Sequence, residues 1–418
     1  MPSAVVRPAK RLLVVGASPM RSGAFATWRE MGLDIVLVDG YSTARYEDLA
    51  HEFWPLDPRD GSADLESIRS LARGCDGITT LSDDSQRTVA VIAEELGLPG
   101  VGSAAATAAR SKTLQRELWE RAGIPVPRWR KVETVEDVRE FYAGGSRSAV
   151  LKPVDGAGGV GALRVENLDE AARHWPIVRL LSPARTAVIE DYVEGREVCV
   201  DAIVTRGAPV FVSVADCEHL AMIGFLCTAH NYAADQPDLA MATAMIQQIV
   251  DALGIGPGNM HVEFKIKDGR WVPIEMGLRP GGAFVPELTV RVRGVDIYEA
   301  QARLALGLDP PVPGMVRGQP EAAYAQSRYL VGEGRVRRFV TPGTIVRGLP
   351  DVKVVNQQAA PGQRTRVPVS EANRAGYAYG WSDDRERLDD QLREAIARLG
   401  KEMGLVVHGN DRGAVLAP

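Results

Sequence analysis

Val150-Leu151-Lys152-Pro153-Val154-Asp155-Gly156-Ala157-Gly158-Gly159-Val160-Gly161 is the most informative run of this chain. A strand-like apolar segment leads into one lysine, Lys152, and four glycines follow this lysine within nine residues. A loop with so few β-carbons can lay its backbone N–H groups against phosphate oxygens, and a lysine at its base neutralises their charge. Glycine-rich turns between strands are also common as plain turns. The run alone therefore leaves phosphate binding and a structural turn open, with Lys152, Gly156, Gly158 and Gly159 as the candidate ligands.

The composition is that of an ordinary globular protein. At 418 residues, of which 45% are hydrophobic and 25% charged, the chain has room for roughly two to four structural units. The formal net charge of −5 and the lack of a Lys/Arg run exclude a general nucleic-acid binder. No apolar stretch approaches the roughly 20 residues of a membrane-spanning helix, and Leu12–Val15 is too short for a signal-peptide core. We expect a cytoplasmic protein with no nucleic-acid or membrane partner.

The cysteines give no local sign of a metal site. The chain has four of them, Cys75, Cys199, Cys217 and Cys227, and none stands in CxxC spacing. Neither a zinc site nor a disulfide framework is therefore predicted from the spacing. Reduced thiols are the expectation.

The first hundred residues alternate between strand-like and helix-like segments. The expected strands are Arg11–Val15, Asp34–Val38 and Gly77–Leu81, and the expected helices are Gly23–Met31, Ala63–Ala72 and Ser85–Leu96. This βαβα order predicts a parallel, Rossmann-like sheet with helices on both faces. Gly16-Ala17-Ser18 and Asp39 imitate a dinucleotide fingerprint, but GxGxxG is absent. A structural turn is therefore favoured there over a nucleotide site.

The rest of the chain mixes helices with antiparallel hairpins. Helices are predicted over Ser111–Ala122, Leu168–Trp175, Ala240–Leu253 and Asp384–Met403, and strands over Ala187–Val193, Val198–Val204, Ala208–Ala215, His261–Lys267, Arg270–Met276, Tyr324–Val331, Thr344–Val346 and Val352–Val355. A proline-rich segment, Pro310–Pro320, separates a final region that mixes strands with one closing helix. Four units are expected, over residues 1–110, 111–187, 188–310 and 311–418.

Two acids form the sharpest local signal. Glu263 and Glu275 lie twelve residues apart on strands joined by a tight turn, and both have apolar neighbours. Strand alternation can place both on one inward face. Burying two carboxylates together is expensive without a counter-charge, and Mg²⁺ is a hard cation that bridges carboxylates to substrate phosphates. Arg279, four residues after Glu275, adds a fixed positive group. A purely structural Glu–Arg cluster is the alternative.

Two further segments are weaker when taken alone. Lys112 at the start of its helix is by default a solvated surface lysine. In Val188–Glu197 an apolar strand enters an acidic segment, whose backbone can hydrogen-bond an adenine edge while Glu197 accepts from the ribose hydroxyls. A charged edge strand is the plainer interpretation of that segment.

Taken in order, these elements resemble the ATP-grasp superfamily. The order runs from Lys112 through the Lys152 loop to Glu190–Val193, and ends with the two acids and the arginine. The phrases Ala122–Pro127 and Glu94–Gly100 are similar to those that flank the nucleotide site in that family. The resemblance covers about residues 10 to 310. It implies an α/β ATP-grasp fold with an N-terminal Rossmann-like (pre-ATP-grasp) domain and a C-terminal α+β cap.

The resemblance also implies roles for single residues. The matching positions are Lys112 and Lys152 for the nucleotide phosphates, Glu190, Tyr192, Val193 and Glu197 for adenosine, Glu263 and Glu275 for the metal, and Arg279 for the acyl-phosphate intermediate or its tetrahedral successor. Lys152 and Arg279 are thereby the implied catalytic residues. The implied cofactors are ATP and two Mg²⁺ ions, which Mn²⁺ can replace.

One position departs from the family pattern. Many members carry asparagine two residues after the second acid, where it helps to hold a metal, whereas this chain has Gly277. Some carboxylate–amine ligases are similar in having glycine here, followed by Arg-x-Gly-Gly. The departure therefore favours that subfamily, and it leaves open how the second Mg²⁺ is completed.

The resemblance implies an ATP-dependent carboxylate–amine ligase that forms an amide through an acyl phosphate, with amino acids as substrates. The segment Asp216–Tyr232 suits a substrate-facing loop, and His230 in it can orient or deprotonate the amine because imidazole titrates near neutral pH. A loop histidine without a catalytic role is the alternative. A biotin-carboxylase-like or purine-pathway ligase and a non-enzymatic ATP-binding protein are the competing functions. Related enzymes are often dimers, so a homodimer is one of the states that the sequence leaves open.

Overall fold

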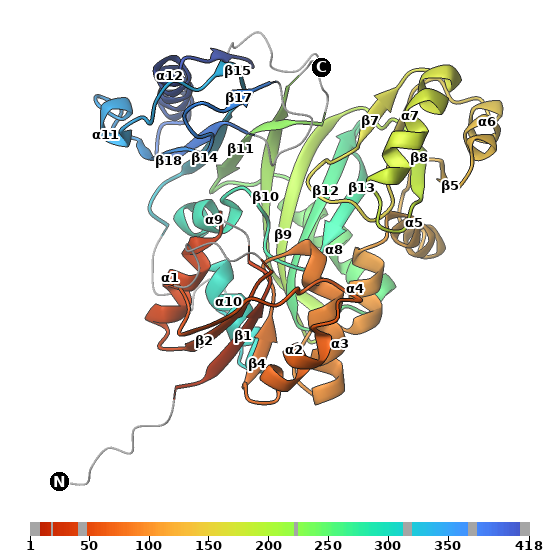
Figure 1. Cartoon of the computed structure of the whole chain (residues 1–418), viewed down its shortest axis with the longest axis horizontal. Helices are drawn as coiled ribbons and strands as arrows, with labels where there is room; N and C mark the ends of the chain where they lie inside the picture. The colour runs from red at the N-terminus through yellow and green to blue at the C-terminus, as the bar shows by residue number, and fades with distance from the viewer. Residues whose placement is uncertain are drawn as a thin grey trace.

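The N-terminal lobe is built on a parallel sheet. The computed structural model describes residues 9–17, 20–40, 48–220, 225–311, 320–366 and 374–409. The sheet has the strand order β3-β2-β1-β4, with β1 Arg11–Val15, β2 Asp34–Val38, β3 Glu52–Trp54 and β4 Gly77–Thr79. Helix α1 (Ser22–Glu30) covers one face, and α2 (Leu65–Ala72) and α3 (Gln86–Leu96) cover the other. The predicted doubly covered parallel sheet is confirmed (Figure 1).

The turn after β1 is held by its own side chains. Gly16 has φ +77°, and the Ala17 N–H donates to Asp39 Oδ2 over 2.8 Å. A β-carbon on Gly16 would lie 2.5 Å from Ser85 Oγ, so the turn packs closely against the 3₁₀ turn Asp83–Ser85. Asp39 thus ties down the turn, as a structural interpretation expects. Ser18 of the predicted motif lies outside the described residues.

A second, antiparallel sheet forms a separate lobe, which we call the lid. Its strand order is β5-β8-β6-β7, with β5 Trp129–Val132, β6 Ala149–Pro153, β7 Leu163–Val165 and β8 Ala187–Asp191. Helices α6 (Val135–Ala143) and α7 (Leu168–Leu180) pack on one face around Phe141 and Trp175. The glycine-rich loop connects β6 to β7 and so lies at one end of this sheet.

The third sheet is the largest, and it runs through the middle of the molecule. Its eight strands have the order β13-β12-β9-β10-β11-β14-β18-β16. They are β9 Arg196–Thr205, β10 Ala208–His219, β11 Cys227–Ala233, β12 Gly258–Lys267, β13 Arg270–Gly277, β14 Tyr324–Leu330, β16 Val352–Gln357 and β18 Gly376–Ser382. One face packs on α4 (Ser103–Ala109), α5 (Lys112–Arg121) and α8 (Leu239–Leu253). The opposite face carries the candidate functional residues. Helices α9 (Val285–Arg293) and α10 (Ile297–Ala305) follow β13 along the chain.

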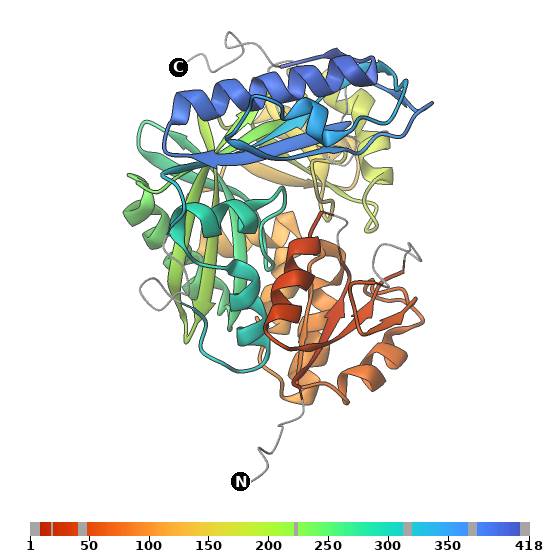
Figure 2. The same ribbon diagram turned by 90° about the vertical axis from the view of Figure 1, so that its left-hand side faces the viewer.

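The C-terminal region completes this sheet rather than standing apart from it. Strand β14 pairs with β11, and α12 (Arg385–Met403) lies across β14 and β18 (Figure 2). Strands β15 (Gly332–Arg335), β17 (Arg364–Thr365) and β19 (Val406–Val407) form a small side sheet. The strand predicted over Thr344–Val346 is wrong: a short helix, α11 (Pro342–Ile345), occupies this segment. Pro342 at its first position has the backbone angle of a helix start, which outweighs the β-branched residues that follow. The four predicted domain ranges stay a prediction.

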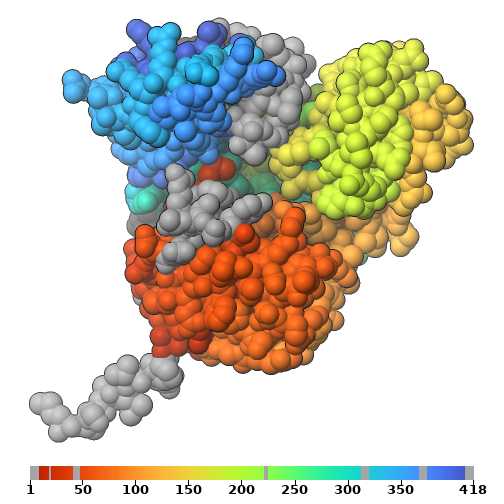
Figure 3. Space-filling view, in the orientation of Figure 1, coloured from red at the N-terminus to blue at the C-terminus, as the bar shows by residue number. Residues whose placement is uncertain are grey.

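The lobes enclose a central hollow. Figure 3 shows the N-terminal lobe (red and orange), the lid (yellow) and the C-terminal region (blue) around it. Among the described residues, no helix is long and apolar enough to cross a membrane.

Candidate functional site

The central sheet, the lid and the N-terminal lobe line one cleft. Most of the predicted site residues line it: Lys152, Gly158, Gly159, Glu190, Tyr192, Val193, Glu197, His230, Glu263, Glu275 and Arg279. Lys112 and Gly156 join this set through a contact of their own, because the Lys112 Nζ donates to the Gly156 carbonyl over 2.6 Å. The structure therefore gathers every predicted site residue around one cavity.

Lys152 is a buried lysine held by a buried acid. Its side chain is 6% exposed, and its Nζ pairs with Glu190 Oε1. Arg116 makes the other contact to this acid, at 2.9 Å from Glu190 Oε2. Burial lowers the pKa of Lys152, against the opposing effect of Glu190. Burial by itself raises the pKa of Glu190, but Arg116 and Lys152 outweigh it and hold that pKa below its usual value. The cluster carries one net positive charge, which suits a phosphate.

Lys112 connects the glycine loop to the acid pair. Ser111 caps α5 by accepting from the Leu114 N–H, which fixes Lys112 at the first turn of the helix. The Lys112 Nζ donates to Glu275 Oε1 over 2.9 Å as well as to the loop carbonyl. This lysine is 5% exposed, so it is not the solvated surface lysine of the alternative interpretation.

The glycine loop is anchored at its base and open above. Asp155 accepts from Ser182 Oγ at 2.6 Å and from the Ala184 N–H at 3.0 Å. Gly158 and Gly159 have φ values of +61° and +71°, and a β-carbon on either would meet no atom within 4 Å. Such a backbone is left-handed and unobstructed, so its N–H groups can approach an anion closely.

The two acids face each other across a hairpin. Glu263 on β12 is the register partner of Glu275 on β13, and a bulge follows Glu263. On its other side Glu263 pairs with Cys199 of β9, so the acids continue one row across the sheet. Two carboxylates side by side at the edge of a phosphate-sized cavity fit the oxygen ligands that Mg²⁺ takes.

The far end of the cleft carries a second charged group. Glu197 accepts from Lys265 Nζ at 2.9 Å and lies 3.0 Å from His219 Nε2. Although burial opposes it, the charge of His219 and then that of Lys265 lower the pKa of Glu197 well below its usual range. Tyr192 lies near this end, with the Arg164 guanidinium 4.1 Å from its ring centroid. The carboxylate is therefore ionised and fixed, as an acceptor for hydroxyl groups requires.

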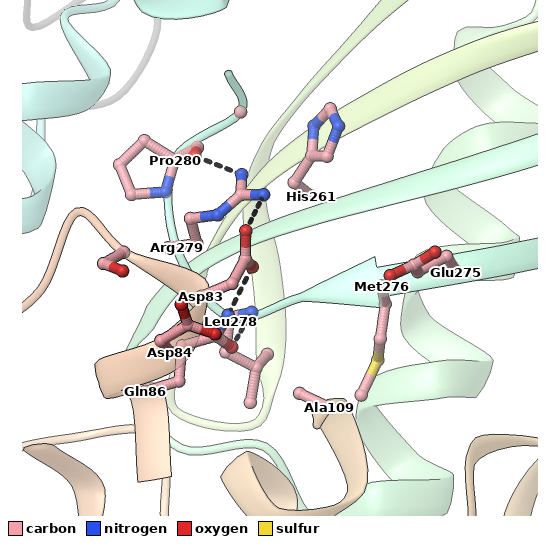
Figure 4. A network of polar contacts seen from close by, with 12 residues as sticks. Asp83, Asp84, Gln86, Ala109, His261, Glu275, Met276, Leu278, Arg279 and Pro280 are labelled. Atoms are coloured by element: carbon pink, nitrogen blue, oxygen red, sulfur yellow. Dashed lines mark hydrogen bonds and ion pairs between the residues drawn. The ribbon is translucent and has the colours of Figure 1, made fainter. Parts of the chain in front are cut away.

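Arg279 is locked to the N-terminal lobe. Its Nη2 donates to Asp83 Oδ2 over 2.5 Å, and Asp83 Oδ1 accepts from Gln86 Nε2 over 2.6 Å (Figure 4). The Leu278 N–H donates to Gln86 Oε1 over 2.7 Å, so the segment that follows β13 is pinned at two points. Burial opposes the shift, but Arg279 and the neighbouring cations lower the pKa of Asp83 to about 2, which keeps the pair charged.

The same contact explains the glycine at position 277. A β-carbon there would lie 3.0 Å from Asp83 Oδ1 and 3.5 Å from Gln86 Nε2. An asparagine side chain would occupy the space that this carboxylate takes. In this chain the N-terminal lobe therefore brings an acid to the place where the family pattern has asparagine.

His230 is not in a loop. The segment Asp216–Tyr232 contributes to β10 and β11, and Cys217 is the register partner of His230. The imidazole is 5% exposed, and its Nδ1 lies 3.2 Å from Tyr329 Oη. Alternation along the strand turns His230 into the cleft and Asn231 to the opposite face of the sheet. Residues 221–224 of the segment lie outside the described residues.

Four residues that pair with predicted site residues were missed by sequence reasoning. They are Arg116, Asp83, His219 and Lys265, each of which pairs with a predicted residue. Arg116 follows Lys112 by four residues on one helix, and that spacing was a usable signal. Nothing local marks the others, because their partners come from distant strands.

A buried acid behind the cleft makes stability depend on pH. Glu287 Oε1 accepts from Tyr298 Oη at 3.2 Å, and burial raises the pKa of Glu287 to about 7 from 4.5. The folded chain thus binds this proton more tightly than the unfolded chain, so stability falls as pH rises from about 4.5 through about 7. We expect Glu287→Gln to reduce that fall by about 1–2 kcal/mol. Thermal unfolding of both proteins between about pH 5 and pH 8 measures it, and parallel curves would contradict it.

Two family models match the chain. An ATP-grasp N-terminal domain matches residues 25–100, and an ATP-grasp domain matches residues 146–287. The second range includes the glycine loop, both acids and Arg279. The matched ranges therefore contain most of the residues that line the cleft.

A curated protein is similar to this chain in sequence, and solved structures share its fold. Carnosine synthase 1 of Homo sapiens is 28% identical over 345 residues, which cover 74% of this chain and 41% of that protein. The chain thus spans about two fifths of the length of this relative. The L-amino acid ligase from Bacillus licheniformis superposes with a TM-score of 0.76 at 20% identity, covering 96% of this chain and 99% of that one. The N5-carboxyaminoimidazole synthetase from Staphylococcus aureus, complexed with ADP, gives 0.74 at 15% identity over 93% and 97%.

Proposed function

We propose that this chain, which belongs to the ATP-grasp superfamily, is an ATP-dependent carboxylate–amine ligase that joins an amino acid to a second amino acid or amine. One observation carries the proposal: two buried lysines, Lys112 and Lys152, meet two register-paired acids, Glu263 and Glu275, at one cleft. Cations for phosphates and oxygen ligands for a divalent metal are what phosphoryl transfer to a carboxylate needs.

Different parts of the cleft bind adenosine, the phosphates and the metal. Glu197, Tyr192 and Val193 hold adenosine at one end, and the N–H groups of the glycine loop with Lys112 and Lys152 hold the phosphates. Glu263 and Glu275 would hold Mg²⁺, which would supply positive charge against the negative charge that builds up during phosphoryl transfer. No protein nucleophile is required, since the substrate carboxylate takes the γ-phosphoryl group and the amine then displaces phosphate. The protein would therefore catalyse the reaction by positioning the substrates and by stabilising the charge that develops on them.

Arg279 and His230 act on the substrates. The Arg279 Nε is a buried donor with no hydrogen-bond acceptor among the described residues, so it can donate to a substrate or intermediate oxygen. His230 lines the same cleft, and its imidazole can take a proton from the attacking amine. Three buried thiols, Cys199, Cys217 and Cys227, line the wall beside His230.

A phosphate-release screen tests this function. We expect ATP-dependent release of phosphate with particular pairs of amino acids or an amino acid and an amine, together with a product whose mass is the sum of the pair minus water. Release that requires bicarbonate with biotin or with an aminoimidazole ribonucleotide would replace the proposal with a carboxylase-type function. Nucleotide binding without turnover on any pair would contradict an enzymatic role.

A further inference from the structure

Three of the four cysteines of this chain converge in the cleft. Cys199 on β9, Cys217 on β10 and Cys227 on β11 are each at most 5% exposed. The Sγ atoms of Cys199 and Cys217 lie 3.0 Å apart, and Cys217 is also in contact with Cys227. They come from three neighbouring strands and line the wall of the cavity. The three sulfur atoms thus gather at one place on the cavity wall.

His230 adds a nitrogen to this cluster. One nitrogen of its ring lies within 4.8 Å of both Cys199 Sγ and Cys217 Sγ, and both ring nitrogens lie 3.6 Å from Cys227 Sγ. Tyr329 sets the tautomer of the ring. Its hydroxyl can donate to the Ala283 carbonyl at 2.8 Å, and Ser327 Oγ lies 2.8 Å from the same phenol oxygen. With the proton directed to Ala283, the phenol oxygen accepts from His230 Nδ1–H at 3.2 Å. The lone pair of the neutral imidazole then resides on Nε2.

This arrangement matches a metal-binding histidine. Such a histidine usually donates its second ring N–H to an oxygen, which fixes the orientation of the ring. Here the Tyr329 hydroxyl takes that position, and it is itself fixed by Ala283. Cys199, Cys217 and His230 therefore fit a cation site with three sulfur and nitrogen ligands, and Cys227 borders this site through its contacts with His230 and Cys217.

Carboxylate ligands and thiol ligands lie on adjacent strands of this sheet, and they prefer different metal ions. Cys199 is the register partner of Glu263, so the row passes from carboxylate to thiol between adjacent strands. Carboxylates select hard cations such as Mg²⁺, whereas thiolates with an imidazole select Zn²⁺ and similar soft ions. The two ligand sets therefore differ in the ion that each would take.

We propose that Cys199, Cys217 and His230, with Cys227 beside them, form a binding site for one thiophilic divalent cation, Zn²⁺ being the type, on the wall of the cleft. Binding displaces the thiol protons, which pass to the solvent, and forms metal–thiolate bonds. The site goes beyond the proposed ligase function. While a cation occupies the His230 lone pair, this imidazole cannot take a proton from an amine, so the proposed base role of His230 belongs to the metal-free cleft.

Cobalt substitution tests the site directly. The full-length protein, kept reduced with a non-chelating reductant and supplied with excess Mg²⁺ to occupy the carboxylates, is titrated with Co²⁺ and then with Zn²⁺. We expect one Co²⁺ per chain with the near-ultraviolet absorption of a Co²⁺–thiolate bond, and its loss when Zn²⁺ displaces the cobalt. Saturation without that absorption would overturn the proposal, because it places the cation on oxygen or nitrogen ligands.

Serine variants locate the ligands. Cys199→Ser and Cys217→Ser are each expected to weaken binding at least about tenfold. Cys75→Ser is the matched control, since Cys75 lies in the N-terminal lobe after α2 and should leave the titration unchanged. Equal losses in all three variants, or none in Cys217→Ser, would overturn the assignment. The spectrum of the unmodified protein decides the question even where a variant folds poorly.

Discussion

Glu275→Ala is expected to lower ATP-dependent phosphate release by about 10³-fold or more, while the protein stays folded. The acid has two partners in the cleft: it is the register partner of Glu263, and it accepts from Lys112 Nζ over 2.9 Å. Removing it takes away one carboxylate of the proposed metal site and also frees the lysine that contacts the glycine loop. Both changes weaken the stabilisation of the negative charge that builds up in the transition state, so we expect the variant to lower mainly kcat.

The control for this variant is an exposed acid outside the cleft. Glu394→Ala removes a carboxylate that pairs with Arg398 at 2.7 Å on α12, and it should leave the rate unchanged. The rates are measured at saturating ATP over a range of Mg²⁺ concentrations. Turnover of Glu275→Ala within about tenfold of the parent at every Mg²⁺ concentration would refute the metal assignment of this acid.

Local patterns were enough to predict most of the fold. The strands β1 and β2 match the prediction residue for residue, because short apolar runs between polar turns leave little choice of structure. The acid hairpin was only partly accessible. The regular register from its turn, with Phe264 opposite Pro273, would pair Glu263 with Ile274, and a bulge between Glu263 and Phe264 brings Glu275 opposite Glu263 instead. Where a proline stood at a helix start, as at Pro342, β-branched residues misled the prediction.

Contacts between distant segments could not be predicted in the same way. Asp83 meets Arg279 across 196 positions of sequence, and Arg116 meets Glu190 across 74. Each contact depends on how two lobes pack, and no single segment carries that information. The thiols show the same limit: the spacing of Cys199, Cys217 and Cys227 gives no metal motif, yet neighbouring strands bring them together. Short spacing motifs such as CxxC detect only ligands that lie close together in the sequence.

Glu190→Gln is expected to destabilise the free protein by about 3–5 kcal/mol and to make its stability depend more strongly on nucleotide. Glu190 is 3% exposed, and it is the buried acid between Arg116 and Lys152. An amide of the same shape leaves these two cations facing each other without a counter-ion. A bound phosphate supplies negative charge beside Lys152, so Mg-ATP should restore part of the loss. Thermal and urea unfolding with and without Mg-ATP measure both effects.

This result would separate two roles of the same residue. The family resemblance places Glu190 among the groups that hold adenosine, whereas its contacts make it the counter-ion that orients Lys152. A counter-ion predicts a large loss of stability and a larger rise in melting temperature with Mg-ATP than in the parent. A direct adenosine ligand predicts the reverse, with normal stability and weakened nucleotide binding. Glu140→Gln, which removes an exposed acid paired with Arg130 on the same lobe, should change neither quantity by more than about 0.5 kcal/mol. Since both contacts that the described residues make to the Glu190 carboxylate come from cations, Arg116 and Lys152, we expect the first outcome.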